Sequence, residues 1–339
     1  MRFQILSIAV VSAVTLGAVG CGGSAPSTPA SVIALDGSST VFPISEAVAE
    51  EFQKANAGMP VTVGVSGTGG GFKKFCRTET AISDASRPIL PPEIKECATA
   101  GVTYLELPVA YDGMAVVVNP KNTWASDITV AELKRLWEPA AQGKIMKWSQ
   151  VRAGWPDRDV RLYGAGADSG TFDYFTEVIN GKSKASRGDF TASEDDNVLV
   201  QGVAGDELAL GFMGLAYYQE NRDKLKLLGV DDENPANGAG AIHPSFDTVR
   251  GGTYRPLSRP MFIYVNLAAL ERPEVKKFVE YYLANTAAMS KEVGFVALAD
   301  AEMALVNARY TNRTAGSVFG ADPGLSPKTL EEWLRGGSR

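Results

Sequence analysis

Short apolar segments with two different periods alternate along the chain. Val61, Val63 and Val65 occupy every second position, as residues on one face of a strand do. Apolar residues in 44–52 and 275–283 recur every three or four positions, which predicts two amphipathic helices. The other predicted strands are 102–107, 115–118, 160–163, 208–212 and 262–265. This alternation predicts an α/β fold with helices packed on both faces of a sheet.

Residues 1–20 are predicted to be a signal peptide. Arg2 supplies a positive charge, and an uncharged, mostly apolar run follows it. Cys21 opens the segment 21–31, whose small, uncharged residues are typical of a flexible tether. The pattern resembles a bacterial lipoprotein signal, in which Cys21 is lipidated, although Ala18 stands where Leu is usual. An ordinary secretory signal is the alternative. No later run is suited to span a bilayer, so we expect an extracytoplasmic protein that is attached to a membrane only through a lipid.

Cysteine usage agrees with export. Once Cys21 is assigned to the lipid, Cys76 and Cys97 remain as an even pair in an oxidising compartment. We therefore expect a disulfide between them, and two unpaired thiols are the alternative.

Composition excludes several classes of function. The chain has 33 Lys and Arg against 39 Asp and Glu, and the basic residues are scattered, so nucleic acid is not an expected partner. His243 is the single histidine in the sequence. With the cysteines paired, little remains for a metal site or a Cys/His nucleophile. We expect no metal, no cofactor and no catalytic residue.

Hydroxyl side chains stand at two predicted helix starts in different halves of the chain. Ser39 and Thr40 precede one helix, and Ser169 and Thr171 flank Gly170 at another. Free N–H groups and the positive end of the helix dipole make such starts suited to an oxyanion. A hydroxyl there is often only a helix cap. Two such starts suggest one anion held between two lobes.

A glycine-rich loop, 66–71, joins the predicted strand 61–65 to a predicted helix that begins near Phe72. It lacks the Gly-Lys-Ser/Thr ending of a Walker loop, and no acidic residue follows at the distance of a dinucleotide fingerprint. An anion cradle between strand and helix is the more specific interpretation, and an ordinary turn is the alternative.

Five motifs occur in order along the chain: D-G-S-S-T-V-F-P, V-S-G-T-G-G-G-F, I-S-D-A-S-R-P-I, K-I-M-K-W and D-S-G-T-F. Together they resemble the periplasmic phosphate-binding protein of the high-affinity phosphate ABC transporter. The resemblance covers nearly all of the chain from residue 32, including the later segment P-L-S-R-P-M-F-I-Y-V. It implies two α/β lobes that close over one phosphate about two crossing strands. The implied lobes are 32–108 with 259–339, and 109–258.

The resemblance also implies a set of phosphate ligands. The positions that match the family's hydroxyl and amide donors are Thr40 (or Ser39, one place earlier), the amide of Val41, Thr68, Ser169, Gly170 and Thr171.

The chain departs from the family pattern at two positions. Some members have an Arg four residues before Ser169, where Ala165 stands here, and an Asp in the first-lobe loop, where Arg87 stands here. We infer that the cation has moved across the cleft to Arg87, which would supply the charge-assisted donor. The alternative is that Arg87 faces solvent or pairs with Glu79 or Glu93.

A carboxylate is expected to decide selectivity. Phosphate near neutral pH carries a proton that a carboxylate accepts, whereas sulfate carries none and is repelled. The candidates are Asp84 and Asp168, with Ser86 as a further ligand in the loop of Asp84. We favour Asp84, because the disulfide loop would hold it beside Arg87.

The leading interpretation is a monomeric, non-enzymatic lipoprotein that binds inorganic phosphate and delivers it to an inner-membrane ABC permease. A phosphate sensor or adaptor without transport is one alternative, and a binder of arsenate, sulfate or molybdate is another. A phosphohydrolase is disfavoured, because no base is visible beside Ser169.

Overall fold

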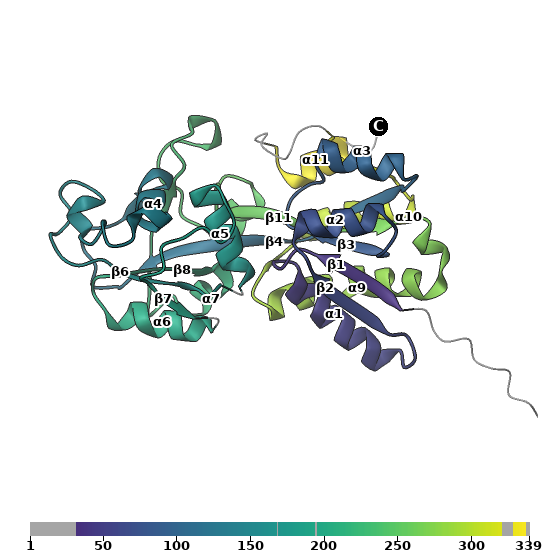
Figure 1. Ribbon diagram of the computed structural model, residues 1–339, viewed down its shortest axis with the longest axis horizontal. Coiled ribbons are helices and arrows are strands. Elements are labelled where there is room, and N and C mark those ends of the chain that lie inside the picture. The colour runs from purple at the N-terminus through teal and green to yellow at the C-terminus, as the bar shows by residue number, and fades with distance from the viewer. Residues whose placement is uncertain (1–31, 168, 194, 321–327, 337–339) are drawn as a thin grey trace, which may run out of the picture.

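The protein is described from a computed structural model that covers residues 32–167, 169–193, 195–320 and 328–336. Two α/β lobes lie side by side, and strands β4 (Tyr104–Val118) and β11 (Ser258–Asn266) run between them (Figure 1). The two-lobe α/β fold expected from the sequence is confirmed. The predicted signal peptide and tether, with Cys21, lie outside the described residues.

One mixed sheet fills the first lobe. Its strand order is β2-β1-β3-β11-β4, with β1 parallel to β2 and β3, and β11 antiparallel to both of its neighbours. The remaining strands here are β1 (Ile33–Gly37), β2 (Val61–Val65), β3 (Ile82–Ala85) and the short β12 (Val296–Ala297), which pairs with β4. The helices of this lobe are α1 (Phe42–Ala55), α2 (Thr68–Cys76), α3 (Pro91–Thr99), α9 (Pro273–Glu292), α10 (Asp300–Thr311) and α11 (Leu330–Gly336).

Strand β4 continues into the second lobe. It pairs with β11 as far as Gly113 and with β8 from Met114 onward. The sheet then runs β8-β6-β7, with all three strands parallel. The main elements of this lobe are α4 (Val130–Trp137), β6 (Arg161–Ala165), α5 (Gly170–Asn180), β7 (Thr191–Ser193), α6 (Asp196–Gly205), β8 (Ala209–Gly214), α7 (Leu215–Glu220) and α8 (Phe246–Arg250). Strands β5 (Asp127–Thr129) and β10 (Gly229–Asp231) form a small separate sheet.

The two helices predicted from their period are present, and their apolar faces are buried. In α1 the buried stripe includes Ile44, Val48 and Phe52. Phe52 packs edge-on against Phe278 of α9, with ring centroids 5.1 Å apart. The contact joins α1, which follows β1, to the long helix α9. The first lobe therefore contains segments from both the early and the late part of the chain.

The strands predicted at 102–107 and 115–118 are parts of one strand, β4. Pro108 lies within it, opposite a shift in register between Met261 and Phe262 of β11. Proline donates no hydrogen bond to a ladder and is accommodated at bulges. Residues 108–114, which separate the two predicted strands, are therefore not a turn, and a continuous strand carries the chain from one lobe to the other.

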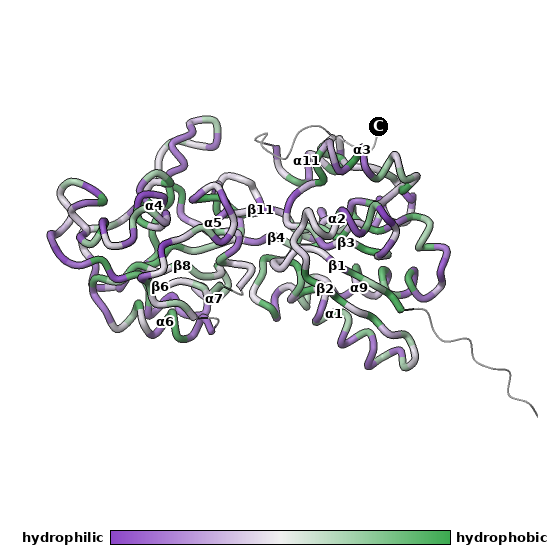
Figure 2. The backbone as a smooth tube through the Cα atoms, in the orientation of Figure 1, coloured by the Kyte–Doolittle hydropathy of each residue, from purple (hydrophilic) through white to green (hydrophobic). Residues whose placement is uncertain are grey.

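Green and purple segments alternate along the helices that cover the sheets (Figure 2). This is the pattern of amphipathic helices packed against a core. Among the described residues, none of the helices has both the length and the apolar character needed to span a membrane.

Candidate functional site

A cleft of about 740 Å³ opens between the lobes. Its first-lobe wall includes Ser39, Thr40, Thr68, Ser86 and Arg87. The opposite wall includes Asp173, Tyr174 and Glu177 of α5, and Arg259 of β11 also faces the cleft. Five of the residues predicted to bind the anion therefore share one cavity.

The hydroxyls at the start of α1 cross the cleft and do not cap the helix. The N-cap residue is Val41, and no side chain bonds to the first turn. Thr40 Oγ1 donates to the Gly170 carbonyl at 3.3 Å, and Ser39 Oγ donates to Asp173 Oδ2 at 3.0 Å. The start of α1 thus has the positive end of a helix dipole without a side-chain cap, beside hydroxyls that contact the other lobe.

The glycine-rich loop sets a second hydroxyl pair beside the first. Thr68 begins α2, whose N-cap Gly67 has φ 75° and lacks a side-chain cap. Thr68 Oγ1 lies 3.1 Å from Ser86 Oγ and accepts from the Ser86 amide at 3.2 Å. Asp36 of β1 helps to hold the loop in place, because its carboxylate accepts hydrogen bonds from Lys74 Nζ at 2.6 Å and from Ser66 Oγ.

The second-lobe motif forms the start of α5, as predicted. Ser169 is the N-cap, and its hydroxyl accepts from the Thr171 amide at 3.2 Å. Gly170 packs tightly against Thr40 of the first lobe. A Cβ at this position would lie 2.7 Å from Thr40 Cα. Only glycine allows this approach of the two helix starts. Ser169, Gly170 and Thr171 are partly buried beside the cleft wall formed by Asp173.

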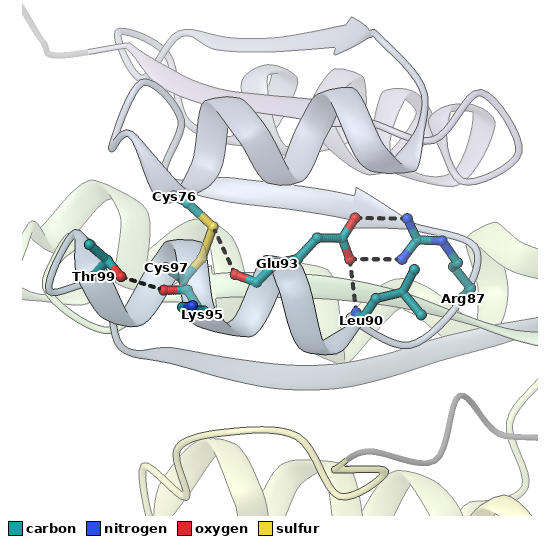
Figure 3. The surroundings of a disulfide bond; sticks show 7 residues. All are labelled: Cys76, Arg87, Leu90, Glu93, Lys95, Cys97 and Thr99. Carbon is teal, nitrogen blue, oxygen red and sulfur yellow. Dashed lines mark hydrogen bonds and ion pairs between the residues drawn. A yellow bond between two sulfur atoms is a disulfide. The ribbon is translucent and has the colours of Figure 1, made fainter.

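The predicted disulfide is confirmed, and it helps to hold Arg87 in place. Cys76, the last residue of α2, is bonded to Cys97 of α3. Arg87 donates to both carboxylate oxygens of Glu93 on α3, at 2.8 and 2.9 Å (Figure 3). Glu93 also accepts from the Leu90 amide. Arg87 lines the cleft, but its guanidinium is turned to a carboxylate, which is the alternative pairing foreseen from the sequence.

Of the two carboxylates expected to set selectivity, Asp84 lies away from the cleft. Asp84 is fully buried in β3, and neither of its oxygens has a hydrogen-bond partner among the described residues. It does not line the cleft. Burial raises the pKa of the Asp84 carboxyl to about 7, and the nearby charge of Asp36 adds to the rise. Asp168 lies outside the described residues.

Arg259 of β11 is a cleft residue that the sequence analysis did not select. Its Nη2 donates to Thr40 Oγ1 at 3.0 Å, and its guanidinium carbon lies 3.4 Å from the centroid of the Tyr174 ring. Asp112 of β4 stands behind it, with Oδ2 3.6 Å from Nε. A signal was present, since Arg259 is a charged residue at the start of an apolar strand in the quoted P-L-S-R-P-M-F-I-Y-V segment.

The chemistry of the cleft is that of an anion receptor. Hydroxyls, two helix starts and two arginines converge there, and these are groups that donate to oxyanions. Among residues 32–167, 169–193, 195–320 and 328–336, no group of three or more His, Cys, Asp or Glu side chains is placed to hold a metal ion.

A family model described as the PBP superfamily domain matches residues 23–286. The chain is 46% identical over 318 residues to Protein SphX from a Synechocystis species, covering 94% of this chain and 93% of that protein. It is 36% identical over 302 residues to Phosphate-binding protein PstS from Staphylococcus saprophyticus, covering 88% of this chain and 90% of that protein.

Solved structures show the same similarity. A crystal structure described as that of a possible phosphate binding protein from Planctomyces limnophilus has a TM-score of 0.80 and 47% identity. The match covers 84% of this chain and 99% of that one. An ABC-type phosphate transport receptor from Vibrio cholerae shares the fold, with a TM-score of 0.60 and 21% identity over 78% of this chain and all of that one.

Proposed function

This chain belongs to the PBP superfamily and, within it, to the family of the PstS phosphate-binding proteins, and from that premise we propose that it binds inorganic phosphate outside the inner membrane and delivers it to an ABC permease. The PstS relative is a phosphate-binding protein by name, and we propose that this chain is likewise a binder and not an enzyme. A monomer that holds one phosphate between its lobes is sufficient for that function.

The observation that carries this proposal is the meeting of helix starts from both lobes at the cleft. Thr40 and Thr68 stand where α1 and α2 begin, and neither helix has a side-chain cap. Gly170, the first residue of α5, approaches Thr40 from the other lobe. An oxyanion placed among them receives hydroxyl and amide donors together with the positive ends of the helix dipoles. Ser39, Thr40, Val41, Thr68, Ser86, Ser169, Gly170 and Thr171 are therefore retained as proposed phosphate ligands. Asp168, outside the described residues, stays a candidate.

Selectivity is assigned to Asp173, in place of Asp84. Asp173 lines the cleft, and its Oδ1 is buried without a hydrogen-bond partner among the described residues. Lys184 Nζ is 3.8 Å from that oxygen. Asp84 instead points into the first lobe, toward Ser45 and Tyr282. An ionised Asp173 would accept the proton of hydrogen phosphate and repel sulfate.

The other candidate functions are less well supported. A sensor or adaptor would use the same cleft and differ only in its membrane partner. Arsenate is nearly isosteric with phosphate and should bind, while sulfate and molybdate lack the proton that Asp173 would accept. A phosphohydrolase would need a base beside Ser169, whose hydroxyl instead caps α5.

The way the protein reaches its site of action is proposed from the sequence. Residues 1–20 would direct export, and Cys21 would carry the lipid, with 21–31 as tether. We propose that residues 32–108 with 259–339 and residues 109–258 move as the two lobes. The change of partner of β4 after Gly113 supports a division near that residue.

The proposal is tested by titrating phosphate into the chain from residue 32 and into Thr40→Val. The valine keeps the shape and removes the hydroxyl, so binding should weaken by about 1–3 kcal/mol. Thr62→Val, on the exposed side of β2, is the matched control and should bind like the parent chain. Equal affinity for phosphate in the Thr40 and Thr62 variants would show that this hydroxyl cluster is not the site.

A further inference from the structure

The guanidinium of Arg259 has donors to spare. It carries five N–H groups, and among the described residues a hydrogen bond is formed with Thr40, at 3.0 Å. Arg259 also forms ion pairs with the carboxylates of Asp112 and Glu177, but at the longer distances of 3.6 and 3.8 Å. Arg259 Nε and Asp112 Oδ2 are both buried without a hydrogen-bond partner in the described part of the chain. A buried donor such as Arg259 Nε is costly to leave unsatisfied, which favours a ligand that accepts from it.

The side chain is held in one place. It is 14% exposed, it stacks on Tyr174 of α5, and it reaches Thr40 at the start of α1. It therefore contacts both lobes while its own backbone belongs to β11, a strand that runs between them (Figure 1). A fixed, planar donor loses little conformational entropy when it binds an oxyanion.

Arg87, unlike Arg259, is neutralised by a carboxylate within hydrogen-bond distance. Both of its terminal nitrogens donate to Glu93, and one also donates to the Pro88 carbonyl. Two of its hydrogen bonds go to Glu93 of α3, as Figure 3 shows. An anion at Arg87 would have to compete with a carboxylate held by the backbone of Leu90.

We propose that Arg259, and not Arg87, is the cation that binds the oxyanion, with Asp112 holding its guanidinium from the side of β4. This inference rests on the proposed function and identifies the charged ligand of that site. It also gives the anion a role in closure, because an oxyanion on Arg259 would tie β11 to the starts of α1 and α5 at once.

Phosphate titrations of the parent chain, Arg259→Ala, Arg259→Lys and Arg87→Ala test the proposal. Loss of a buried charged donor should weaken binding by about 100-fold in Arg259→Ala. Lysine keeps the charge without the planar fork, so Arg259→Lys should bind between the two. Arg87→Ala should lose less than about tenfold, because its guanidinium is already hydrogen-bonded to both oxygens of Glu93. Guanidinium chloride at a non-denaturing concentration should restore binding to Arg259→Ala, and urea should not.

The inference is overturned if a folded Arg259→Ala binds phosphate like the parent chain, or if Arg87→Ala shows the larger loss. Failure of guanidinium to restore any affinity would also count against a direct contact. If the alanine variant does not fold, Arg259→Gln carries the same test with nearly the same length. A parent chain that binds no phosphate would overturn the proposed function as well, so the two failures are distinguishable.

Discussion

Whether a charged side chain near the cleft can bind an anion depends on what already surrounds it. Arg87 is matched by Glu93 in a two-pronged pair, whereas Arg259 has an unsatisfied Nε. Asp173 has an unsatisfied oxygen at the cleft, whereas Asp84 is sealed inside the first lobe. The residues that form internal ion pairs or lie buried and the residues proposed to bind the ligand are thus of the same chemical types.

Replacement of Asp173 should change selectivity. Asp173→Asn substitutes a group that both donates and accepts for one that only accepts. Sulfate should gain relative to phosphate, even if both anions bind less tightly, and calorimetric titration with each anion measures the ratio. Asp84→Asn is the matched control and should leave the ratio unchanged. A shift in Asp84→Asn with none in Asp173→Asn would return selectivity to the buried residue.

The buried carboxyl of Asp84 should make stability depend on pH. Its pKa is raised to about 7 in the folded chain, above the ordinary 3.8 expected when unfolded. Between these values the folded state keeps a proton that the unfolded state has lost, so stability falls as pH rises from about 4 to 7. The loss attributable to Asp84 is about 4 kcal/mol.

Asp84→Asn removes that titration. Thermal unfolding at pH 8 should therefore occur at a higher temperature in Asp84→Asn than in the parent chain, and the difference should vanish near pH 4. Other buried carboxyls, including Asp112, also titrate, so the test is the difference between the two chains at each pH. The exposed Asp223→Asn serves as control. A constant difference across this range would contradict the account.

At the scale of elements, the first-lobe wall of the cleft is built by α2 and α3 acting together. The disulfide joins Cys76 to Cys97, and the loop between them includes β3 and the Ser86–Arg87 segment. Helix α2 begins at the proposed ligand Thr68. A change in how α2 and α3 pack should therefore alter the position of the proposed ligand hydroxyls.

Removal of the disulfide should lower stability and be partly offset by ligand. The cysteines are 21 residues apart, and closing a loop of that size stabilises by about 3 kcal/mol. Cys76→Ala with Cys97→Ala should melt at a lower temperature, and saturating phosphate should recover part of the loss because it binds the folded state. An unchanged melting temperature without phosphate would show that α2 and α3 need no cross-link.

The sequence predicted the helices and strands better than it predicted the directions in which individual side chains point. Periodicity predicted α1 and α9 because each has one buried stripe. Every residue of β3 is buried, so alternation could not show that Asp84 faces away from the cleft. Nor could the sequence show that Arg87 is hydrogen-bonded to a carboxylate while Arg259 has longer ion pairs, since that depends on how α3 and β11 are placed in space.

At the scale of the whole molecule, the cleft lies where the chain passes between its lobes. Strands β4 and β11 carry Asp112 and Arg259, and the helix starts of α1 and α5 meet beside them. The order of the family motifs predicted this two-lobe arrangement, because the resemblance extended over nearly the whole chain. A ligand that contacts all of these elements stabilises the closed arrangement of the lobes.

The position of a bound anion tests the central claim most directly. Crystals of the chain from residue 32 grown with arsenate would reveal the ion by the anomalous scattering of arsenic. We predict one strong peak between the lobes, within hydrogen-bond distance of Thr40, Thr68 and Arg259. A peak at Arg87 without contact to Arg259, a peak outside the cleft, or no peak at saturating arsenate would contradict the account.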